Sequence, residues 1–324
     1  MKAVLCTHFC KPDELEIGDL PDPVAAEGQA VVRVRAAALN FFDTLIIAGK
    51  YQTKPAFPFS PAAEFAGEVE SVGPGVTAVR PGDRVAGNIG YGAAREKIVV
   101  AADRLVPLPD GLDVVRAAGV IVTYGTTLYA LQDRARLHAG ETLAVLGAAG
   151  GVGLAAIEIG KLMGARVVAC ASSAEKLAFT QQHGADVGVN YAAEDLKDAL
   201  RRVTDGRGPD VIYDPVGGPL AESALRAIAW GGRFLVVGFA AGEIPKLPLN
   251  LVLLKSCDVR GVFWGAWTER DPAGNRANLA RIMDWCAQGK LSAHVHATFP
   301  LERIAEAMQA LSDRKAMGKV ILKP

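Results

Sequence analysis

The chain has 324 residues, of which 50% are hydrophobic and 22% are charged, a composition typical of folded globular proteins and not of disordered chains. Lysine plus arginine and aspartate plus glutamate both number 35, so the formal net charge at pH 7 is zero. Proteins that bind nucleic acids usually carry a basic excess, and this balance therefore argues against DNA or RNA as the main partner. The length predicts two domains or one large domain.

Neither disulfide bonds nor a membrane helix are expected. The five cysteines are widely spaced and form no CxxC pair, which favours free thiols in a reducing compartment. The longest apolar segment, 143–157, is shorter than the roughly 20 residues that a membrane helix needs, and the N-terminus lacks the apolar region of a secretory signal. We therefore expect a cytoplasmic protein without a membrane partner.

The chain up to about residue 120 has the pattern of a β-rich domain. Residues 29–40 (QAVVRVRAAALN) alternate between apolar side chains and arginine over part of their length, which is the period of a half-buried strand. A second short strand is expected at 68–72, and turns rich in glycine and proline follow at 73–75 and 81–83. Short strands at this spacing predict a small barrel or sandwich.

Beyond residue 120, strand and helix patterns alternate. Strands are expected at 143–146, 165–171, 210–214, 233–237 and 259–263. One helix is expected from the glycines after the first strand to Met163, and another at 173–183. Repeated strand–helix units predict a parallel sheet with helices on both faces. An amphipathic helix at 301–312 and a strand at 319–323 follow, and the pattern leaves open which half of the chain they complete.

A glycine-rich loop is the strongest local signal. It reads GAAGGVG from Gly147 to Gly153, after an apolar strand and at the start of a helix. Glycines let the backbone turn sharply and let a pyrophosphate approach the amides at the positive end of the helix. The loop therefore favours a dinucleotide site, although its GxxGxxG spacing has one residue more than the usual GxGxxG. The alternative is a tight strand–helix turn whose glycines serve packing.

The tip of the next strand favours NADP over NAD. An NAD site usually places an acidic residue about 20 residues after the glycines, to bind the ribose hydroxyl. Here the strand ends in Ser172 and Ser173 without an acidic residue at its tip. We interpret Glu175 as part of a capping box with Ser172. Hydroxyl groups with Lys176 close behind suit a 2′-phosphate, which binds hydrogen-bond donors and positive charge.

Several further motifs occur in a defined order along nearly the whole chain. They are ALNFFD at 38–43, EFAGEV at 64–69, GPGV at 73–76, GDRV at 82–85, GAAGGVG at 147–153, GAD at 184–186, NY at 190–191 and GKVIL at 318–322. In these motifs the chain resembles the quinone oxidoreductases, the zeta-crystallin-like group of the medium-chain dehydrogenase/reductase superfamily. The AxxGGVG form of the loop in that family accounts for its additional residue.

The resemblance implies an α/β protein with two domains. A GroES-like β-barrel catalytic domain is expected at 1–122 and 262–324, and a Rossmann domain, whose doubly wound parallel sheet binds NADP, at 123–261. The implied activity is NADPH-dependent reduction of a quinone or a similar electron-poor carbonyl compound by hydride or electron transfer. One alternative is an NADPH-dependent enone or enoyl-thioester reductase. An alternative of another class is an NADPH-binding structural or RNA-binding protein of the zeta-crystallin type.

The resemblance also assigns site residues. Gly150, Gly151 and Val152 are expected at the pyrophosphate. Around the 2′-phosphate it places Ser172, Lys176, Tyr191 and Arg314, and it assigns Ser173 to the cofactor as well. Near the nicotinamide it places Gly238, Phe239, Phe263, Asn40 and Thr126. Asn40 and Thr126, together with Tyr51 at the mouth of the substrate site, are also the expected catalytic residues.

No metal is expected. The zinc alcohol dehydrogenases of the same superfamily carry a cysteine where this chain has Asn40 and a histidine where it has Ala63, and neither residue can replace those ligands. None of the tyrosines has a lysine four residues later, which excludes the short-chain reductases. The expected partners are a small-molecule quinone or enone and a second copy of the chain, because the family commonly forms homodimers. The apolar region 259–267 is a candidate for the dimer edge.

Overall fold

The computed structural model describes residues 1–324, which form two compact units. The first unit comprises residues 1–122, 279–289 and 293–324, and the second comprises 123–278 and 290–292. The sequence predicts the return to the first domain at 262, whereas the structure places the first return at Leu279. Helix α9 (Trp264–Arg270) stays with the second unit because Trp267 stacks on Tyr129, with ring centroids 4.5 Å apart.

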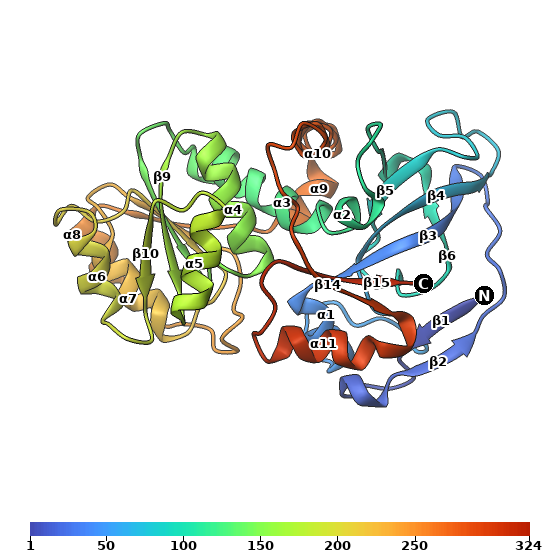
Figure 1. Ribbon diagram of the computed structural model, residues 1–324, viewed down its shortest axis with the longest axis horizontal. Coiled ribbons are helices and arrows are strands. Elements are labelled where there is room, and N and C mark those ends of the chain that lie inside the picture. The colour runs from blue at the N-terminus through green and yellow to red at the C-terminus, as the bar shows by residue number, and fades with distance from the viewer. The chain divides into compact units, whose positions relative to one another are not determined.

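The first unit is built on a seven-stranded sheet and a separate two-stranded sheet, β1–β2 (Figure 1). The larger sheet has the order β14-β15-β3-β4-β5-β7, with β6 also paired to β3. The strands are β1 (Lys2–Leu5), β2 (Glu16–Asp19), β3 (Gln29–Leu39), β4 (Glu64–Val72), β5 (Arg84–Asn88), β6 (Lys97–Ala101), β7 (Leu105–Pro107), β14 (Val295–Pro300) and β15 (Lys319–Lys323). The helices are η1 (Pro12–Glu14), α1 (Phe41–Ile47), η2 (Ala102–Arg104), α2 (Val114–Ala118), η4 (Leu301–Arg303) and α11 (Ile304–Ser312). Helix α10 (Pro272–Ala287) contains the change of unit.

Strand β3 organises this sheet. Val32 and Val34 are buried in the core of the unit, whereas Arg33 and Arg35 are exposed. The alternation confirms the strand that the sequence predicts. Because β3 pairs with β4, β6 and β15, it brings segments from the beginning and the end of the chain into one sheet.

The end of the chain completes the first unit. Strand β15 runs antiparallel to β3, with Ile321 opposite Ala38, and parallel to β14. Helix α11 contributes Ile304, Ala307 and Met308 to the same core. The predicted helix and strand near the C-terminus are therefore confirmed, and pairing with β3 decides the question that periodicity leaves open.

The second unit contains a six-stranded sheet of order β10-β9-β8-β11-β12-β13, in which every pair is parallel (Figure 1). This is the strand order of a Rossmann domain. The strands are β8 (Thr142–Leu146), β9 (Arg166–Ala171), β10 (Val187–Asn190), β11 (Val211–Asp214), β12 (Arg233–Val236) and β13 (Asp258–Gly261). The helices are α3 (Ile121–Leu128), the π-helix η3 (Tyr129–Ala135), α4 (Gly151–Leu162), α5 (Ala174–Gln182), α6 (Leu196–Arg202), α7 (Pro219–Ala227), α8 (Leu249–Lys255) and α9.

Both faces of the parallel sheet are buried, as the almost unbroken apolar run of β8 predicts. Ala144 and Leu146 of β8 belong to a core that also contains Leu200 of α6, Leu225 of α7 and Leu251 of α8. Their neighbours Leu143 and Val145, which alternate with them along the strand, are fully buried as well. Helices α4 and α5 lie on one side of the sheet in Figure 1, next to β8, β9 and β10.

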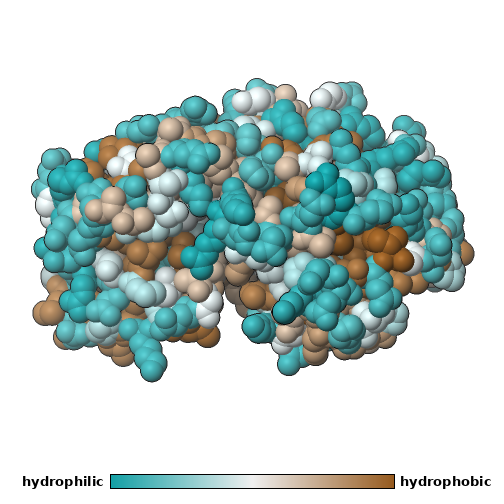
Figure 2. Space-filling model, turned by 60° about the horizontal axis from the view of Figure 1, so that its bottom comes forward, coloured by the Kyte–Doolittle hydropathy of each residue, from teal (hydrophilic) through white to brown (hydrophobic).

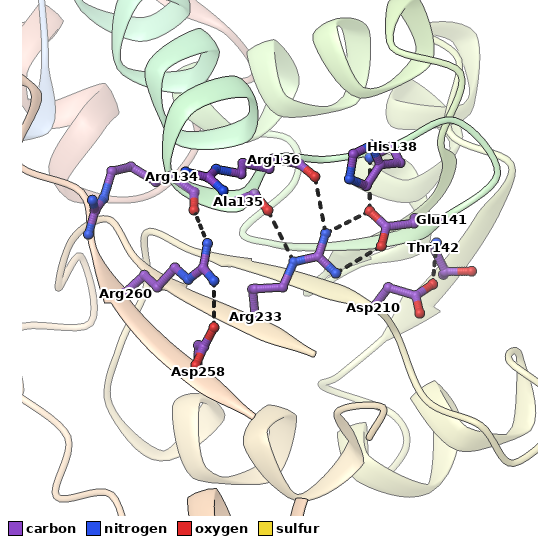
Figure 3. Close-up of polar contacts among 10 residues, drawn as sticks. All are labelled: Arg134, Ala135, Arg136, His138, Glu141, Thr142, Asp210, Arg233, Asp258 and Arg260. Atoms are coloured by element: carbon purple, nitrogen blue, oxygen red, sulfur yellow. Dashed lines mark hydrogen bonds and ion pairs between the residues drawn. The ribbon is translucent and has the colours of Figure 1, made fainter. Parts of the chain in front are cut away.

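Arginines tie together the amino-terminal edge of this sheet (Figure 3). Arg233, at the start of β12, forms two hydrogen bonds of 2.8 and 2.6 Å with Glu141, which precedes β8. It also donates to the carbonyl of Ala135, the last residue of η3. Arg260 of β13 donates to the carbonyl of Arg134 and pairs with Asp258. The end of the π-helix is thereby held to β12 and β13.

The buried carboxylate of Glu158 contacts residues next to both points at which the chain enters the second unit. Glu158, on α4, accepts hydrogen bonds from the hydroxyl of Tyr124 at 2.8 Å and from the backbone N–H of Ser292 at 3.0 Å. The hydroxyl of Ser292 also donates to Glu158. Nδ1 of His183 lies 3.0 Å from Oε1 of Glu158. Helix α4 therefore anchors the segments around residues 124 and 292.

The surface carries both hydrophilic and hydrophobic side chains. On the face drawn in Figure 2, hydrophilic side chains cover most of the area and hydrophobic side chains form separate patches. No helix has the length and apolar character that crossing a bilayer requires.

Candidate functional site

Five predicted cofactor positions follow the carboxyl ends of parallel strands in the second unit. Gly150 follows β8, Ser172 follows β9, Tyr191 follows β10, Gly238 follows β12 and Phe263 follows β13. Because parallel strands point the same way, the residues that follow them gather at one edge of the sheet. Ligands of open α/β sheets bind at this edge.

The glycine loop has the geometry of a phosphate cradle. Gly147 has φ +59°, and a Cβ on Gly153 would lie 2.4 Å from the carbonyl oxygen of Gly147. Gly150 is the N-cap of α4, and no side chain caps this helix. The first amides of α4 can therefore bind an anion. The position of the loop between β8 and α4 is the one that the sequence predicts.

The tip of β9 presents hydroxyl groups and a cation. The N-cap of α5 is Ser173, whose Oγ accepts the N–H of Lys176 at 3.3 Å. The capping box expected from Ser172 and Glu175 is thus wrong, because the helix begins one residue later and Ser173 takes the capping role. Ser172 is exposed, and the ammonium of Lys176 lies 3.5 Å from its hydroxyl.

A buried aspartate, which the sequence patterns did not indicate, shapes the neighbouring loop. Asp214, the last residue of β11, accepts the N–H groups of Val216 and Gly217, each at 2.8 Å. Burial raises the pKa of Asp214. A Cβ on Gly217 would lie 2.9 Å from the Phe239 ring, so the loops after β11 and β12 pack closely. The strand followed by Asp-Pro-Val-Gly-Gly is the signal that could have indicated this turn.

Thr126 lies in α3 and is half-buried. Its neighbour Thr127 is fully buried, with its hydroxyl 2.9 Å from the hydroxyl of Tyr213 in β11 and 3.4 Å from the carbonyl of Val152. Thr127 therefore holds α3 against the first turn of α4. The sequence contains no local signal for this contact, because its partners lie on other elements.

Adjacent strand ends bring three polar residues together in the first unit. Lys319 begins β15, Asn40 follows β3, and Glu64 begins β4. The ammonium of Lys319 lies 2.7 Å from Oδ1 of Asn40 and 2.7 Å from Oε1 of Glu64, and it also donates to the carbonyl of Leu39 at 3.0 Å. Nδ2 of Asn40 donates to Oε1 of Glu64 at 3.0 Å. All three side chains are buried.

A second carboxylate lies beside this cluster. Asp43 of α1 is fully buried, and its Oδ2 accepts the N–H of Asn40 at 2.7 Å, while its Oδ1 has no hydrogen-bond partner. Burial raises the pKa of Asp43 to about 7, against the opposing effects of the Asn40 N–H and the Lys319 ammonium. Tyr51, stacked on Phe42 at 5.5 Å, has a raised pKa because it is buried and close to Asp43.

The predicted site residues are thus divided between the units. Asn40, Tyr51 and Arg314 belong to the first unit, where Arg314 follows α11 and is exposed. The second unit holds the other predicted positions, which are Thr126, Gly150, Gly151, Val152, Ser172, Ser173, Lys176, Tyr191, Gly238, Phe239 and Phe263. No group of three or more histidine, cysteine, aspartate or glutamate side chains is arranged to hold a metal ion.

Comparison with known proteins agrees with this architecture. Residues 26–110 match the alcohol dehydrogenase GroES-like domain, and residues 151–280 match the zinc-binding dehydrogenase family. A quinone oxidoreductase-like protein 2 homologue from Nematostella vectensis is 38% identical, with 99% of this chain and 88% of the relative covered. The chain belongs to the quinone oxidoreductase family of the medium-chain dehydrogenase/reductase superfamily.

Solved structures of this family have the same fold. A quinone oxidoreductase from Pseudomonas syringae is 32% identical, with a TM-score of 0.93 over 100% of this chain and 99% of the other. The quinone oxidoreductase of Escherichia coli, solved in complex with NADPH, is 27% identical, with a TM-score of 0.92 over 100% of both chains. The predicted family and fold class, a GroES-like domain with a Rossmann domain, are confirmed. The chain is an oxidoreductase of this family.

Proposed function

We propose that this quinone oxidoreductase-family protein uses NADPH to reduce a quinone, or a similar electron-poor carbonyl compound, by hydride or electron transfer without a metal ion. The observation that carries the proposal is the combination of an uncapped glycine loop with a β9 tip that presents Ser172 and Lys176 and no carboxylate. The NADPH complex of the Escherichia coli relative supports the same choice of cofactor.

The residues present fit this cofactor. The cradle at Gly150, Gly151 and Val152 has room for a pyrophosphate because it carries no capping side chain. The hydroxyl of Ser172 and the ammonium of Lys176 would bind a 2′-phosphate through charge-assisted hydrogen bonds. We assign supporting roles around the phosphate to Ser173, Tyr191 and Arg314.

NADPH would supply the hydride, and the protein would orient the reactants. We assign Gly238, Phe239, Phe263 and Thr126 to the nicotinamide, Asn40 to a hydrogen bond from its amide to a carbonyl oxygen, and Tyr51 to the acceptor. Because burial raises the pKa of Tyr51, its hydroxyl keeps its proton at neutral pH. It can therefore donate a hydrogen bond or a proton to the oxygen of the acceptor.

Metal independence is part of the proposal. Asn40 and Ala63 stand where zinc dehydrogenases of the superfamily carry cysteine and histidine ligands. The carboxylate of Glu64 already has a cation in contact, the ammonium of Lys319 at 2.7 Å. We expect dialysis against EDTA to leave the turnover of NADPH unchanged, and a loss that added zinc restores would contradict this part.

The decisive experiment compares NADPH with NADH as donors, and 1,4-benzoquinone, 9,10-phenanthrenequinone and crotonyl-CoA as acceptors. We expect quinone turnover with a strong preference for NADPH. Turnover of crotonyl-CoA alone would instead identify an enoyl-thioester reductase. Tight NADPH binding without turnover of any acceptor would favour the structural or RNA-binding alternative, and a preference for NADH would contradict the 2′-phosphate site.

We also propose that two copies of the chain associate through the second unit. Strand β13 lies at the end of the parallel sheet and pairs only with β12. Val259 on this strand is 41% exposed, and Leu249 and Leu253 of α8 are each 78% exposed. A strand with one open edge, preceded in the chain by a helix with exposed leucines, offers hydrogen-bonding groups and apolar area to a second copy.

A further inference from the structure

The Asn40 amide has contacts that define its orientation. Lysine only donates hydrogen bonds, and a carboxylate only accepts them. Oδ1 of Asn40 faces the ammonium of Lys319 at 2.7 Å, and Nδ2 faces Oε1 of Glu64 at 3.0 Å. Turning the amide over would place the NH2 group against the ammonium and the carbonyl oxygen against the carboxylate. Lys319 and Glu64 together therefore allow one orientation only.

The hydrogen bonds around the ammonium are complete. Its three hydrogens match three acceptors, namely the carbonyl of Leu39, Oδ1 of Asn40 and Oε1 of Glu64. The second oxygen of Glu64 accepts the N–H of Val122 at 2.8 Å. One hydrogen on Nδ2 of Asn40 remains without a protein acceptor, and Asn40 is 8% exposed.

Stability alone does not explain a buried pair of this kind. The Lys319 and Glu64 side chains are 5% and 0% exposed, and the cost of taking both charges out of water commonly equals or exceeds their attraction. In some proteins such a pair instead selects one arrangement among several. Asp43 and Tyr51 are the other titratable groups next to the cluster.

We propose that Lys319 is a positioning residue that, together with Glu64, sets the orientation of the Asn40 amide, so that its remaining N–H is presented to a carbonyl oxygen of the bound reactants. This inference rests on the proposed function, because that function supplies the carbonyl oxygen to which the Asn40 amide would donate. It adds a residue near the C-terminus that the family motifs in the sequence did not assign to the site.

The test uses the double variant Lys319→Met/Glu64→Gln. It removes both charges with little change in volume, which is close to neutral for stability, whereas Lys319→Met alone leaves an unpaired buried carboxylate. The amide that replaces the Glu64 carboxylate can accept the N–H of Val122 and donate to Asn40, so the Asn40 amide turns over. Lys323→Met, on the exposed end of the same strand, is the matched control.

We expect the double variant to melt close to the wild type and to bind NADPH within about twofold. Its kcat with quinone should fall at least about tenfold, as when one preorganised hydrogen-bond donor is lost. Lys323→Met should match the wild type. If Lys319 has only a structural role, Lys319→Met should lose activity because it is less stable, and the double variant should regain both stability and activity. That result would overturn the proposal.

A second readout does not depend on turnover. In protein labelled with ¹⁵N-asparagine, the Asn40 amide resonances are those that vanish in Asn40→Ala. They should shift in the double variant and stay unchanged in Lys323→Met, and unchanged resonances in the double variant would overturn the proposal. If the wild type reduces no quinone, the proposed function fails, while these resonances and the kinetics with any other acceptor still test the role of Lys319.

Discussion

At the scale of single residues, burial and the partners of each polar group determine its chemistry. Asp43 and Glu64 are both fully buried carboxylates in the first unit. Glu64 has an ammonium within 2.7 Å, whereas Asp43 has one oxygen without a partner and a pKa raised to about 7. Burial with an incomplete set of partners therefore favours the protonated form of Asp43.

The raised pKa of Asp43 predicts a pH-dependent stability. The native state holds this proton up to about pH 7, whereas the unfolded chain releases it near 3.8. The contribution of Asp43 is thus fully present below about pH 3.8 and is lost as the pH rises to about 7, by up to about 1.4 kcal/mol per pH unit. Asp43→Asn should lack this trend in urea unfolding between about pH 5 and 8. Parallel curves for the two proteins would contradict the prediction.

Lys176 should discriminate between the two nicotinamide cofactors. Because its ammonium lies beside Ser172, Lys176→Ala should raise the Kd of NADPH about tenfold, as expected for one charge-assisted hydrogen bond, and leave that of NADH within about twofold. Titration of cofactor fluorescence measures both constants. Lys197→Ala, on α6, is the control, and an equal loss for both cofactors would argue against a 2′-phosphate contact.

At the scale of elements, the turn between β8 and α4 combines two different requirements for glycine. A Cβ on Gly153 would lie 2.4 Å from a backbone oxygen, whereas one on Gly150 would lie 3.4 Å from its nearest neighbour. Gly150 also has an ordinary φ of −75°. The structure therefore separates Gly153, whose close backbone contact requires glycine, from Gly150, where the fold itself leaves room for a Cβ.

Alanine substitutions should reveal this difference. We expect Gly153→Ala to lower both the melting temperature and the affinity for NADPH. Gly150→Ala should fold like the wild type and bind NADPH at least about tenfold more weakly, because its methyl group stands where the pyrophosphate would meet the amides. Calorimetry with and without cofactor measures both effects. Normal NADPH binding by Gly150→Ala would place the pyrophosphate elsewhere.

The arginine network at the opposite edge of the same sheet should affect stability and not cofactor binding (Figure 3). Burial opposes ionisation of Glu141, but hydrogen bonds from Arg233 and His138 lower its pKa below the usual 4.5. Its contribution is therefore present above about pH 4.5 and lost as the pH falls. Glu141→Gln should cost about 1–2 kcal/mol at about pH 7 and progressively less as the pH falls below about 4.5, with unchanged Kd for NADPH. A cost that does not change with pH would contradict this assignment.

At the scale of the whole molecule, the chain passes between two units, and the second unit presents an open sheet edge. Glu158 of α4 holds Tyr124 and Ser292, which lie near two of these passages. Helix α4 thus begins at the predicted pyrophosphate site and anchors these two segments further along its length. The exposed leucines of α8 lie shortly before β13 in the sequence.

A charge on that edge should separate the copies. Because Val259 is on the edge strand β13 and Leu253 is on α8, Val259→Lys/Leu253→Lys should place like charges at the proposed contact and shift the mass measured by light scattering from two chains to one. The wild type should elute as a dimer. Lys substitutions of Ile17 and Val24, exposed in the first unit, are the control, and a monomeric wild type would contradict the proposed dimer.

The sequence by itself determined features that depend on neighbouring residues. The alternation in β3, the apolar run of β8, the glycine loop, and the amphipathic segment at 301–312 all follow from local periodicity and backbone freedom. The same local patterns place Gly150, Ser172 and Lys176 just beyond the ends of strands. The capping box at Ser172 was wrong because adjacent serines offer two start points for one helix, and periodicity does not resolve a shift of one residue.

Only the tertiary structure decided which distant segments meet. Lys319 and Glu64 are 255 positions apart, and they touch because β15 and β4 both pair with β3. The same pairing placed the last helix and strand in the first unit. Burial of Asp43, Asp214 and Thr127 depends likewise on elements that pack against them. Local sequence carries no record of such partners, since strand pairing and desolvation are properties of the assembled fold.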